Sequence, residues 1–236
     1  MEQGFFITGT DTNIGKTRAT LTLMHYFQAQ GKTVVGMKPV ASGCDFIEGK
    51  LCNQDALLLQ KNASVQLEYE LINPFAYQAA ISPHLAAEEN PVVLPKIVSV
   101  FDVLKQHAQI VLVEGVGGWY VPLNQQGDDV ESMASCLGLP VIMVVGMRLG
   151  CLNHARLTYQ AIINSGLRCA GWLANCVDPV MQKLPENIDW LEQGIIAPLL
   201  GVLPYMPTAD FKVLAKTIDF AGHINHNNNA VFHTNS

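Results

Sequence analysis

The chain has 236 residues, of which 49% are hydrophobic and only 14% charged, and its formal net charge is −6. This composition excludes a largely disordered chain, and without a basic excess a nucleic-acid partner has no electrostatic footprint. No apolar stretch reaches the roughly 20 residues of a membrane-spanning helix, and the first residues lack the basic and apolar regions of a signal peptide. We therefore expect a folded cytoplasmic protein that binds neither nucleic acid nor membrane.

The six cysteines point to the same compartment. None forms a CxxC pair, and no spacing of cysteine and histidine suits a zinc site. Several lie in apolar stretches, where a thiol behaves as a small hydrophobic group. Free, reduced thiols are therefore expected at Cys44, Cys52, Cys136, Cys151, Cys169 and Cys176.

Strand and helix patterns alternate along the chain. In order, apolar runs and helical spacing predict a strand at 4–8, a helix at 16–30, a strand at 33–38, helices and strands in turn at 95–106, 110–113, 130–137 and 141–145, a helix at 153–165, and strands at 170–174 and 199–203. Asn153 is the expected N-cap of its helix. This alternation predicts an α/β fold, a doubly wound and mainly parallel sheet with helices on both faces. We expect a single domain over residues 1–221 and a disordered polar tail at 222–236.

The segment GTDTNIGKT, at 9–17, joins the first predicted strand to the first predicted helix. It ends in the Gly-Lys-Thr of phosphate-binding loops, although five residues rather than the usual four separate Gly9 from Gly15. Loop amides and the positive end of a helix bind phosphate oxygens. Lys16 would add charge at the β- and γ-phosphates, and the Thr17 hydroxyl would ligate Mg²⁺. Gly-Lys-Thr also occurs at ordinary helix starts, but the strand before it and the helix after it favour nucleotide binding.

Two further charged residues end predicted strands. Lys38 ends the strand at 33–38, and Glu114 follows the strand at 110–113. The carboxyl ends of parallel strands form the crevice in which α/β proteins bind ligands. There Glu114 would hold the same magnesium ion, and Lys38 would bring a second positive charge to a phosphorylated reaction centre. Taken alone, either residue could equally be an incidental charged residue at the end of a strand, with no functional role.

Taken together, a series of segments resembles the dethiobiotin synthetase family of P-loop NTPases. The segments run in order over about 200 residues, and they are GTDTNIGKT at 9–17, KPVASG at 38–43, NQDA at 53–56, NP at 73–74, SPH at 82–84, VEGVGGWYVPL at 113–123, VVGMRLGCLNH at 144–154, AGWLANCV at 170–177 and APLLGVLP at 197–204. The phosphate loop is shared by many NTPases, whereas KPVASG, VEGxGGW and LGCxNH in that order are far more specific. The extra loop residue is the form that this family carries.

The resemblance implies an ATP-dependent cyclo-ligase of biotin biosynthesis. Such an enzyme converts 7,8-diaminononanoate, CO₂ and MgATP into dethiobiotin, ADP and phosphate. One amine captures CO₂ as a carbamate, whose oxygen attacks the γ-phosphate to give a carbamic–phosphoric anhydride. The second amine then attacks the carbamate carbon and expels phosphate.

The resemblance also assigns residue roles. Lys38 and Lys16 would be catalytic, the magnesium set would be Thr17, Asp55 and Glu114, and Thr12 and Ser42 would hydrogen-bond the diamine or its carbamate. Asn175 would read the adenine edge. The complete set implied for ATP is Thr12, Asn13, Ile14, Gly15, Lys16, Thr17, Asp55, Glu114, Gly115, Val116, Gly117, Asn175, Cys176, Pro204, Tyr205 and Met206.

A homodimer with its active sites at the interface is implied as well. The segment Gly150, Cys151, Leu152 and Asn153 would bind the substrate carboxylate on the partner subunit, because a helix start is a natural anion site. Two departures from the family pattern stand out. Asn13 replaces a glutamate of some members, and after Pro204 the adenine-side acidic residue has no obvious match, with Asp210 as the candidate.

Three other readings remain open. A ParA/MinD-type ATPase switch has a lysine five residues before the last lysine of its loop, where this chain has Asp11. Another amide ligase of the same fold, such as a cobyrinate-amidating enzyme, carries a glutamine-hydrolysing domain, for which this chain is too short. A non-catalytic nucleotide-binding module would not need Lys38 and Ser42 beside the phosphate loop.

Overall fold

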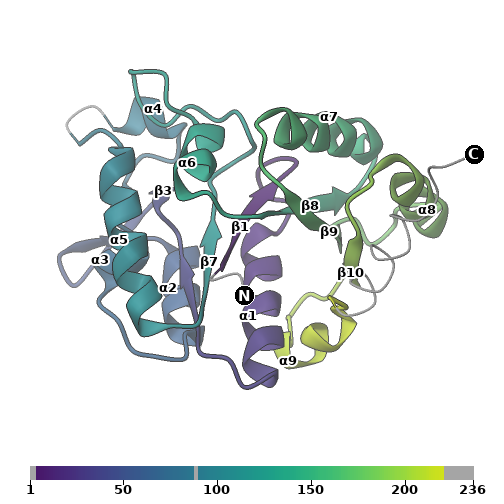
Figure 1. Ribbon diagram of the computed structural model, residues 1–236, viewed down its shortest axis with the longest axis horizontal. Helices are drawn as coiled ribbons and strands as arrows, with labels where there is room; N and C mark the ends of the chain where they lie inside the picture. The colour runs from purple at the N-terminus through teal and green to yellow at the C-terminus, as the bar shows by residue number, and fades with distance from the viewer. Residues whose placement is uncertain (1–3, 88–89, 221–236) are drawn as a thin grey trace, which may run out of the picture.

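A six-stranded parallel sheet forms the centre of the computed structural model, which describes residues 4–87 and 90–220 (Figure 1). The strands are β1 (Gly4–Gly9), β2 (Val34–Met37), β7 (Ile110–Glu114), β8 (Val141–Met147), β9 (Cys169–Cys176) and β10 (Leu199–Leu203). Their order is β10-β9-β8-β1-β7-β2, and every pairing is parallel. This confirms the predicted α/β class. The predicted tail at 222–236 lies outside the described residues.

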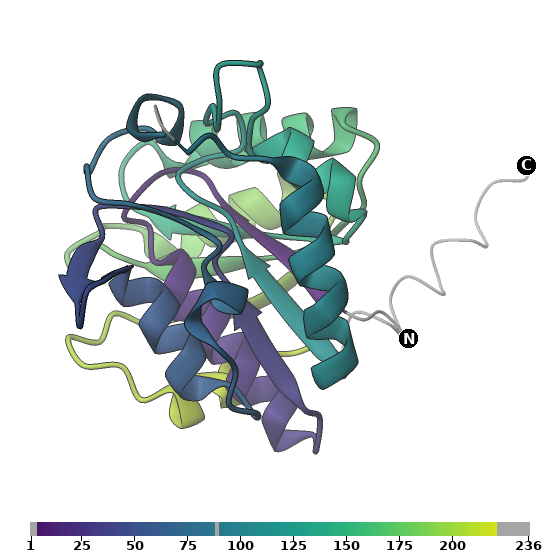
Figure 2. The ribbon, with the colours of Figure 1, turned by 90° about the vertical axis from the view of Figure 1, so that its left-hand side faces the viewer.

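Helices cover both faces of the sheet, as Figure 2 shows. One face carries α1 (Lys16–Ala29), α2 (Gln54–Asn62), the short α9 (Phe211–Leu214) and the 3₁₀ turn η1 (Ala215–Thr217). The other carries α5 (Leu94–His107), α6 (Val130–Leu137), α7 (Cys151–Asn164) and α8 (Leu184–Gly194). Strands enclosed on both sides read as continuous apolar runs, and every residue of β1, β7 and β8 is buried.

The stretch between β2 and α5 contains several short elements that the sequence pattern does not predict. They are β3 (Val40–Ser42), β4 (Asp45–Ile47), β5 (Lys50–Cys52), α3 (Tyr69–Ile72), β6 (Phe75–Tyr77) and α4 (Pro83–Ala86), together with α2. β3 pairs with β6 in parallel, and β4 and β5 form an antiparallel hairpin. Apart from the nine-residue α2, these elements have only three or four residues, which is too short for a period to emerge. Both pairs are small sheets separate from the six-stranded sheet, and β3 begins only three residues after β2 ends.

The predicted cap of α7 is wrong. The helix begins at Cys151 with Gly150 as its N-cap, and Asn153 lies inside the first turn. Gly150 has a φ of +93°, in the left-handed region that glycine adopts at no steric cost. Other predicted ends differ from the observed ones by a few residues. All six cysteines are free, as expected. Among residues 4–87 and 90–220, no helix has the length and apolar character to cross a membrane.

Candidate active site

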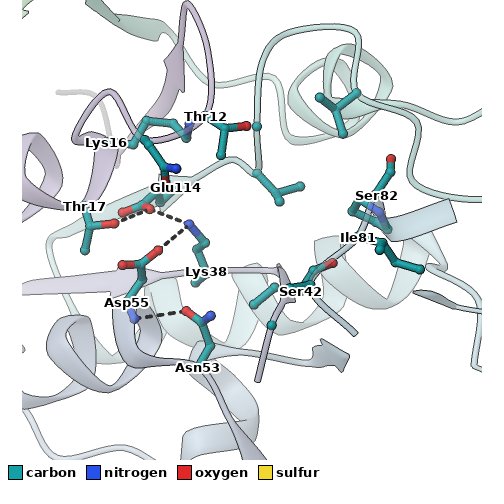
Figure 3. A pocket seen from close by; sticks show the side chains of 18 of the residues that line it. Thr12, Lys16, Thr17, Lys38, Ser42, Asn53, Asp55, Ile81, Ser82 and Glu114 are labelled. Carbon is teal, nitrogen blue, oxygen red and sulfur yellow. Dashed lines mark hydrogen bonds and ion pairs between the residues drawn. The ribbon is translucent and has the colours of Figure 1, made fainter. Parts of the chain in front are cut away.

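A cavity of about 950 Å³ lies at the carboxyl ends of β1, β2 and β7 (Figure 3). The phosphate loop forms one wall, and the inserted stretch after β2 forms another. Its lining residues are Thr12, Asn13, Gly15, Lys16, Thr17, Lys38, Ala41, Ser42, Gly43, Asn53, Asp55, Ala80, Ile81, Ser82, Pro83, Glu114, Val116, Gly117 and Val121. The fold thus brings Lys16, at the end of the phosphate loop, together with Lys38 and Glu114, at the ends of β2 and β7, as their sequence positions predict.

Ile14 packs the phosphate loop against the end of the sheet, beside Gly9 and Gly146. Its side chain is buried, and a Cβ added at Gly146 of β8 would lie only 2.7 Å from the Ile14 Cβ. A Cβ at Gly9 would approach the Ile14 side chain to 2.8 Å. Two glycines therefore leave room for Ile14, whose side chain does not line the cavity. Its neighbours Asn13 and Gly15 have φ values of +58° and +82°, and asparagine tolerates this conformation better than most residues.

The Lys16 side chain folds back onto the phosphate loop. It is only 7% exposed, and its Nζ donates a 2.8 Å hydrogen bond to the carbonyl oxygen of Asp11. Burial and the nearby ammonium of Lys38 lower the pKa of Lys16 to about 8. The carbonyl oxygen of Asp11 is neutral. A triphosphate bound in the loop would give the Lys16 ammonium an anionic partner instead.

Lys38 lies between two carboxylates at the floor of the cavity (Figure 3). Its Nζ is 2.5 Å from Glu114 Oε1 and 3.2 Å from Asp55 Oδ2, and the Thr17 hydroxyl donates to the same Glu114 oxygen over 2.8 Å. Burial alone would lower the pKa of Lys38, but Glu114 and Asp55 outweigh it, so the pKa is raised. Lys38 therefore carries its positive charge throughout the neutral range.

The same cluster fits a magnesium ion. Thr17, Asp55 and Glu114 supply a hydroxyl and two carboxylates, the hard oxygen ligands that Mg²⁺ prefers. Glu114 is fully buried, and its Oε2 has no hydrogen-bond partner among the described residues. A buried carboxylate oxygen without a partner is costly, and a cation beside it would remove that cost.

Two asparagines that the sequence reasoning left without a role position these groups. Asn53 caps α2, since its Oδ1 accepts bonds from the backbone amides of Asp55 and Ala56 at 3.0 and 3.3 Å. Asn73 is buried, and its Nδ2 donates to the Lys38 carbonyl oxygen over 2.7 Å. Asn53 lies in the segment NQDA and Asn73 in the segment NP, two of the segments that carry the family resemblance. That resemblance was the only sequence feature that could have pointed to these two residues.

The far wall of the cavity combines hydroxyl groups with apolar side chains. Ser42 and Ser82 face it across from Thr12 (Figure 3), and the Ser42 hydroxyl is buried with no partner among the described residues. Ile81 and Val121 add apolar surface to the cavity lining. Ser82 is a further polar lining residue that the sequence reasoning did not select.

Other residues of the expected sets lie outside this cavity. Asn175 and Cys176 end β9, Pro204 to Met206 follow β10, Gly115 follows β7, and residues 150–153 lie at the start of α7. Asn175 contacts the phosphate loop, donating from Nδ2 to the Ile14 carbonyl oxygen over 2.7 Å. Asp210 accepts bonds from the amides of Lys212 and Val213 as the N-cap of α9.

This sheet order, with a Gly-Lys-Thr loop after its central strand, defines a P-loop NTPase fold. Solved structures agree with it. The septum site-determining protein MinD of Pyrococcus horikoshii OT3, complexed with Mg-ADP, aligns with a TM-score of 0.55 at 16% identity, over 92% of this chain and 87% of that one. A ParA family ATPase of Chlorobium tepidum TLS aligns with a TM-score of 0.54 at 10% identity, over 92% and 91%. At such identities the likeness shows the fold alone.

Sequence comparisons identify the family. A family model described as an AAA domain matches residues 3–212. The chain is 48% identical over 208 residues to the ATP-dependent dethiobiotin synthetase BioD of Xanthomonas axonopodis pv. citri, covering 87% of this chain and 92% of that protein. The enzyme of the same name from Xylella fastidiosa is 47% identical over 205 residues, covering 86% and 90%. The chain belongs to the family of ATP-dependent dethiobiotin synthetases.

Proposed function

We propose that this protein closes the ureido ring of dethiobiotin in biotin biosynthesis, from 7,8-diaminononanoate, CO₂ and ATP. The observation that carries the proposal is the cluster of Lys16, Lys38, Thr17, Asp55 and Glu114 around one cavity. Phosphoryl transfer needs positioning and charge neutralisation more than covalent chemistry by the protein. Two lysines, a phosphate loop and a set of oxygen ligands are the groups that such a transfer requires.

The chemistry proceeds in three steps. One amine of the substrate adds to CO₂, losing a proton, and forms a carbamate. A carbamate oxygen attacks the γ-phosphorus of ATP, the bond to the β-phosphate oxygen breaks, and ADP leaves. The second amine then attacks the carbon of the carbamic–phosphoric anhydride, loses a proton and expels phosphate as the ring closes.

Each step has its residues in the cavity. Lys16 and the amides of 12–17 hold the triphosphate. Lys38, held between Glu114 and Asp55, places a permanent charge where the carbamate oxygen and the γ-phosphate meet, and so stabilises the charge that develops in the transfer. The hydroxyls of Thr12 and Ser42 orient the amine and its carbamate.

Magnesium is the metal that we assign to Thr17, Asp55 and Glu114. When bound, it would neutralise negative charge on the β- and γ-phosphates. Asp55 is the most exposed of the charged groups in this cluster, with 42% of its side chain accessible. Its carboxylate is therefore free to turn from Lys38 towards the ion.

A homodimer is the assembly that we propose. Residues 150–153 do not line the cavity of their own subunit, while Leu149 beside them is 98% exposed and Leu157 on α7 is 63% exposed. We infer that this end of α7, with these two exposed leucines, contacts the partner subunit and brings the α7 start to the partner's substrate. Mixing Lys38→Ala protomers with Gly150→Val protomers tests this proposal. In a hybrid dimer, one of the two sites combines an intact Lys38 from one protomer with an intact Gly150 from the other, so activity should return. Failure of activity to return would count against shared sites.

We also infer a cytoplasmic location, which the free thiols support.

The competing switch function makes an opposite prediction about what triggers hydrolysis. At the position of the switch lysine, Asp11 forms an ion pair with Arg148 of the same chain at 2.5 Å. ATP turnover should therefore depend on 7,8-diaminononanoate with bicarbonate. Turnover stimulated instead by DNA or lipid vesicles, and indifferent to the diamine, would favour the switch.

A further inference from the structure

The proposed reaction releases protons that a group at the cavity must accept. An alkyl amine such as that of a lysine side chain has a pKa of about 10. At neutral pH the two substrate amines are therefore ammonium groups, which have no lone pair for attack on carbon. Each amine must lose one proton before it attacks and a second one when its new N–C bond has formed.

The charged groups that line the cavity already have other roles. They are Lys16, Lys38, Asp55 and Glu114. Lys38 is protonated, and its ammonium is bonded to Asp55 and Glu114, the two carboxylates that we assign to magnesium. Lys16 is bonded to the Asp11 carbonyl oxygen within the phosphate loop, where a cation is needed. None of these four groups is therefore available as a base for an amine.

Ser82 and His84 offer a different acceptor on the far wall. Ser82 lines the cavity across from Lys38 and Glu114 (Figure 3), and its Oγ is 2.9 Å from Nδ1 of His84. A hydroxyl group can accept one hydrogen bond while it donates another. The Ser82 hydroxyl can thus accept from an ammonium group in the cavity and donate to the imidazole behind it.

The backbone holds His84 in this position from two sides. Its amide donates to the Pro122 carbonyl oxygen over 3.3 Å, and its own carbonyl oxygen accepts from Gln125 Nε2 over 2.9 Å. The Ser82 side chain makes no capping hydrogen bond to α4, the helix that carries the histidine, so its hydroxyl is available. His84 is only partly buried, and a proton taken up by its imidazole can pass on to water.

We propose that Ser82 and His84 form the proton relay for the substrate amines, a role that rests on the proposed function. The ammonium nitrogen gives a proton to Ser82 Oγ while the Ser82 hydroxyl proton moves to His84 Nδ1, and the imidazole becomes an imidazolium. The freed lone pair of the amine forms the bond to the carbon of CO₂. The imidazolium passes a proton to water, since imidazole accepts and releases protons near neutral pH.

The test measures kcat/KM for 7,8-diaminononanoate at saturating MgATP and bicarbonate, with dethiobiotin as the product. We expect Ser82→Ala and His84→Ala each to lower it about 100-fold, a usual contribution of proton transfer by a side chain. The dissociation constant of ATP should stay unchanged. Because a break at either residue stops the relay, the double variant should be no slower than the single variants. Losses that multiply in the double variant would overturn the relay.

Added bases distinguish proton transfer from packing. Imidazole and its methyl- and halogen-substituted derivatives, supplied to His84→Ala, should restore part of the lost turnover in the order of their basicity. Restoration in the order of their size would show that His84 only fills space, and would overturn the relay. Ser82→Thr keeps the hydroxyl group and should retain turnover. Its comparison with Ser82→Ala decides the matter if His84→Ala does not fold.

His25 provides the matched control. It is also partly buried, its Nε2 lies 2.9 Å from Asn62 Oδ1, and it does not line the cavity. His25→Ala should leave kcat/KM unchanged and should not respond to the added imidazoles. An active wild type beside unaffected Ser82 and His84 variants would overturn the relay alone. A wild type that forms no dethiobiotin would overturn the proposed function, and the relay with it.

Discussion

The Nζ of Lys38 and the Oε1 of Glu114 lie 2.5 Å apart, joining the ends of β2 and β7. Both side chains are almost completely buried. A buried ion pair costs desolvation energy that a surface pair does not, so this arrangement is a poor device for stability alone. The ion pair instead holds the positive charge of Lys38 in a fixed position beside the phosphate loop.

Replacing Lys38 by alanine should leave ATP binding largely intact and lower turnover at least about tenfold, because the charge acts on the transferring group and not on the bound nucleotide. Turnover in single-cycle experiments and ATP affinity by calorimetry would be measured together. In this variant Glu114 loses its charged partner and keeps only the Thr17 hydroxyl, so thermal unfolding would be measured alongside the kinetics. Near-normal turnover in a folded variant would remove Lys38 from the reaction.

Replacing Asp55 by asparagine should shift the magnesium titration of activity to higher concentration, since a neutral amide is a weaker ligand than a carboxylate. The helix cap from Asn53 uses the backbone of residue 55, so the local fold is preserved. Asp45→Asn, an exposed carboxylate on β4, is the matched control. A titration identical to that of the wild type would exclude Asp55 from the metal set.

ATP affinity should fall as the pH rises above about 8, where the free enzyme's Lys16 loses its proton. Phosphate oxygens favour the charged lysine and raise its pKa. Binding at about pH 9 should therefore take up a proton, whereas binding well below pH 8 should not. Calorimetry in two buffers of different ionisation enthalpy measures this uptake, which should vanish in Lys16→Met. No uptake in the wild type would contradict the assignment.

Gly146→Ala should displace the phosphate loop through Ile14, because the new methyl group would lie 2.7 Å from its Cβ. The KM for ATP should rise about tenfold, as small misplacements of a binding loop are expensive, and stability should fall by about 1–3 kcal/mol. Gly194→Ala, with its nearest atom 4.0 Å away on Trp190, is the control. Equal effects of the two substitutions would show that Ile14 does not need this space.

Much of the central fold was predictable because the strands are buried on both faces and the helices have long periodic patterns. Val130–Leu137 and Leu199–Leu203 have the predicted bounds. The stretch between β2 and α5 was not predictable, since its elements are stabilised by contacts with one another. The hydrogen bond of Asn73 to the Lys38 backbone, between positions 35 residues apart, is of this kind.

The candidate site divides in the same way. Lys16, Thr17, Lys38 and Glu114 follow from strand ends and one loop, because parallel strands end at a common edge. Asp55 lies at the start of a short helix that no pattern locates, and only the family resemblance selects it.

The most direct test of the central claim is a product assay. Purified protein would be incubated with MgATP, bicarbonate and 7,8-diaminononanoate, and dethiobiotin would be followed by mass alongside ADP. We expect dethiobiotin to appear one-for-one with ADP, and neither to form when the diamine is omitted. Binding of ATP without any dethiobiotin would leave the fold and the phosphate loop standing, and would contradict the assignment of the substrate.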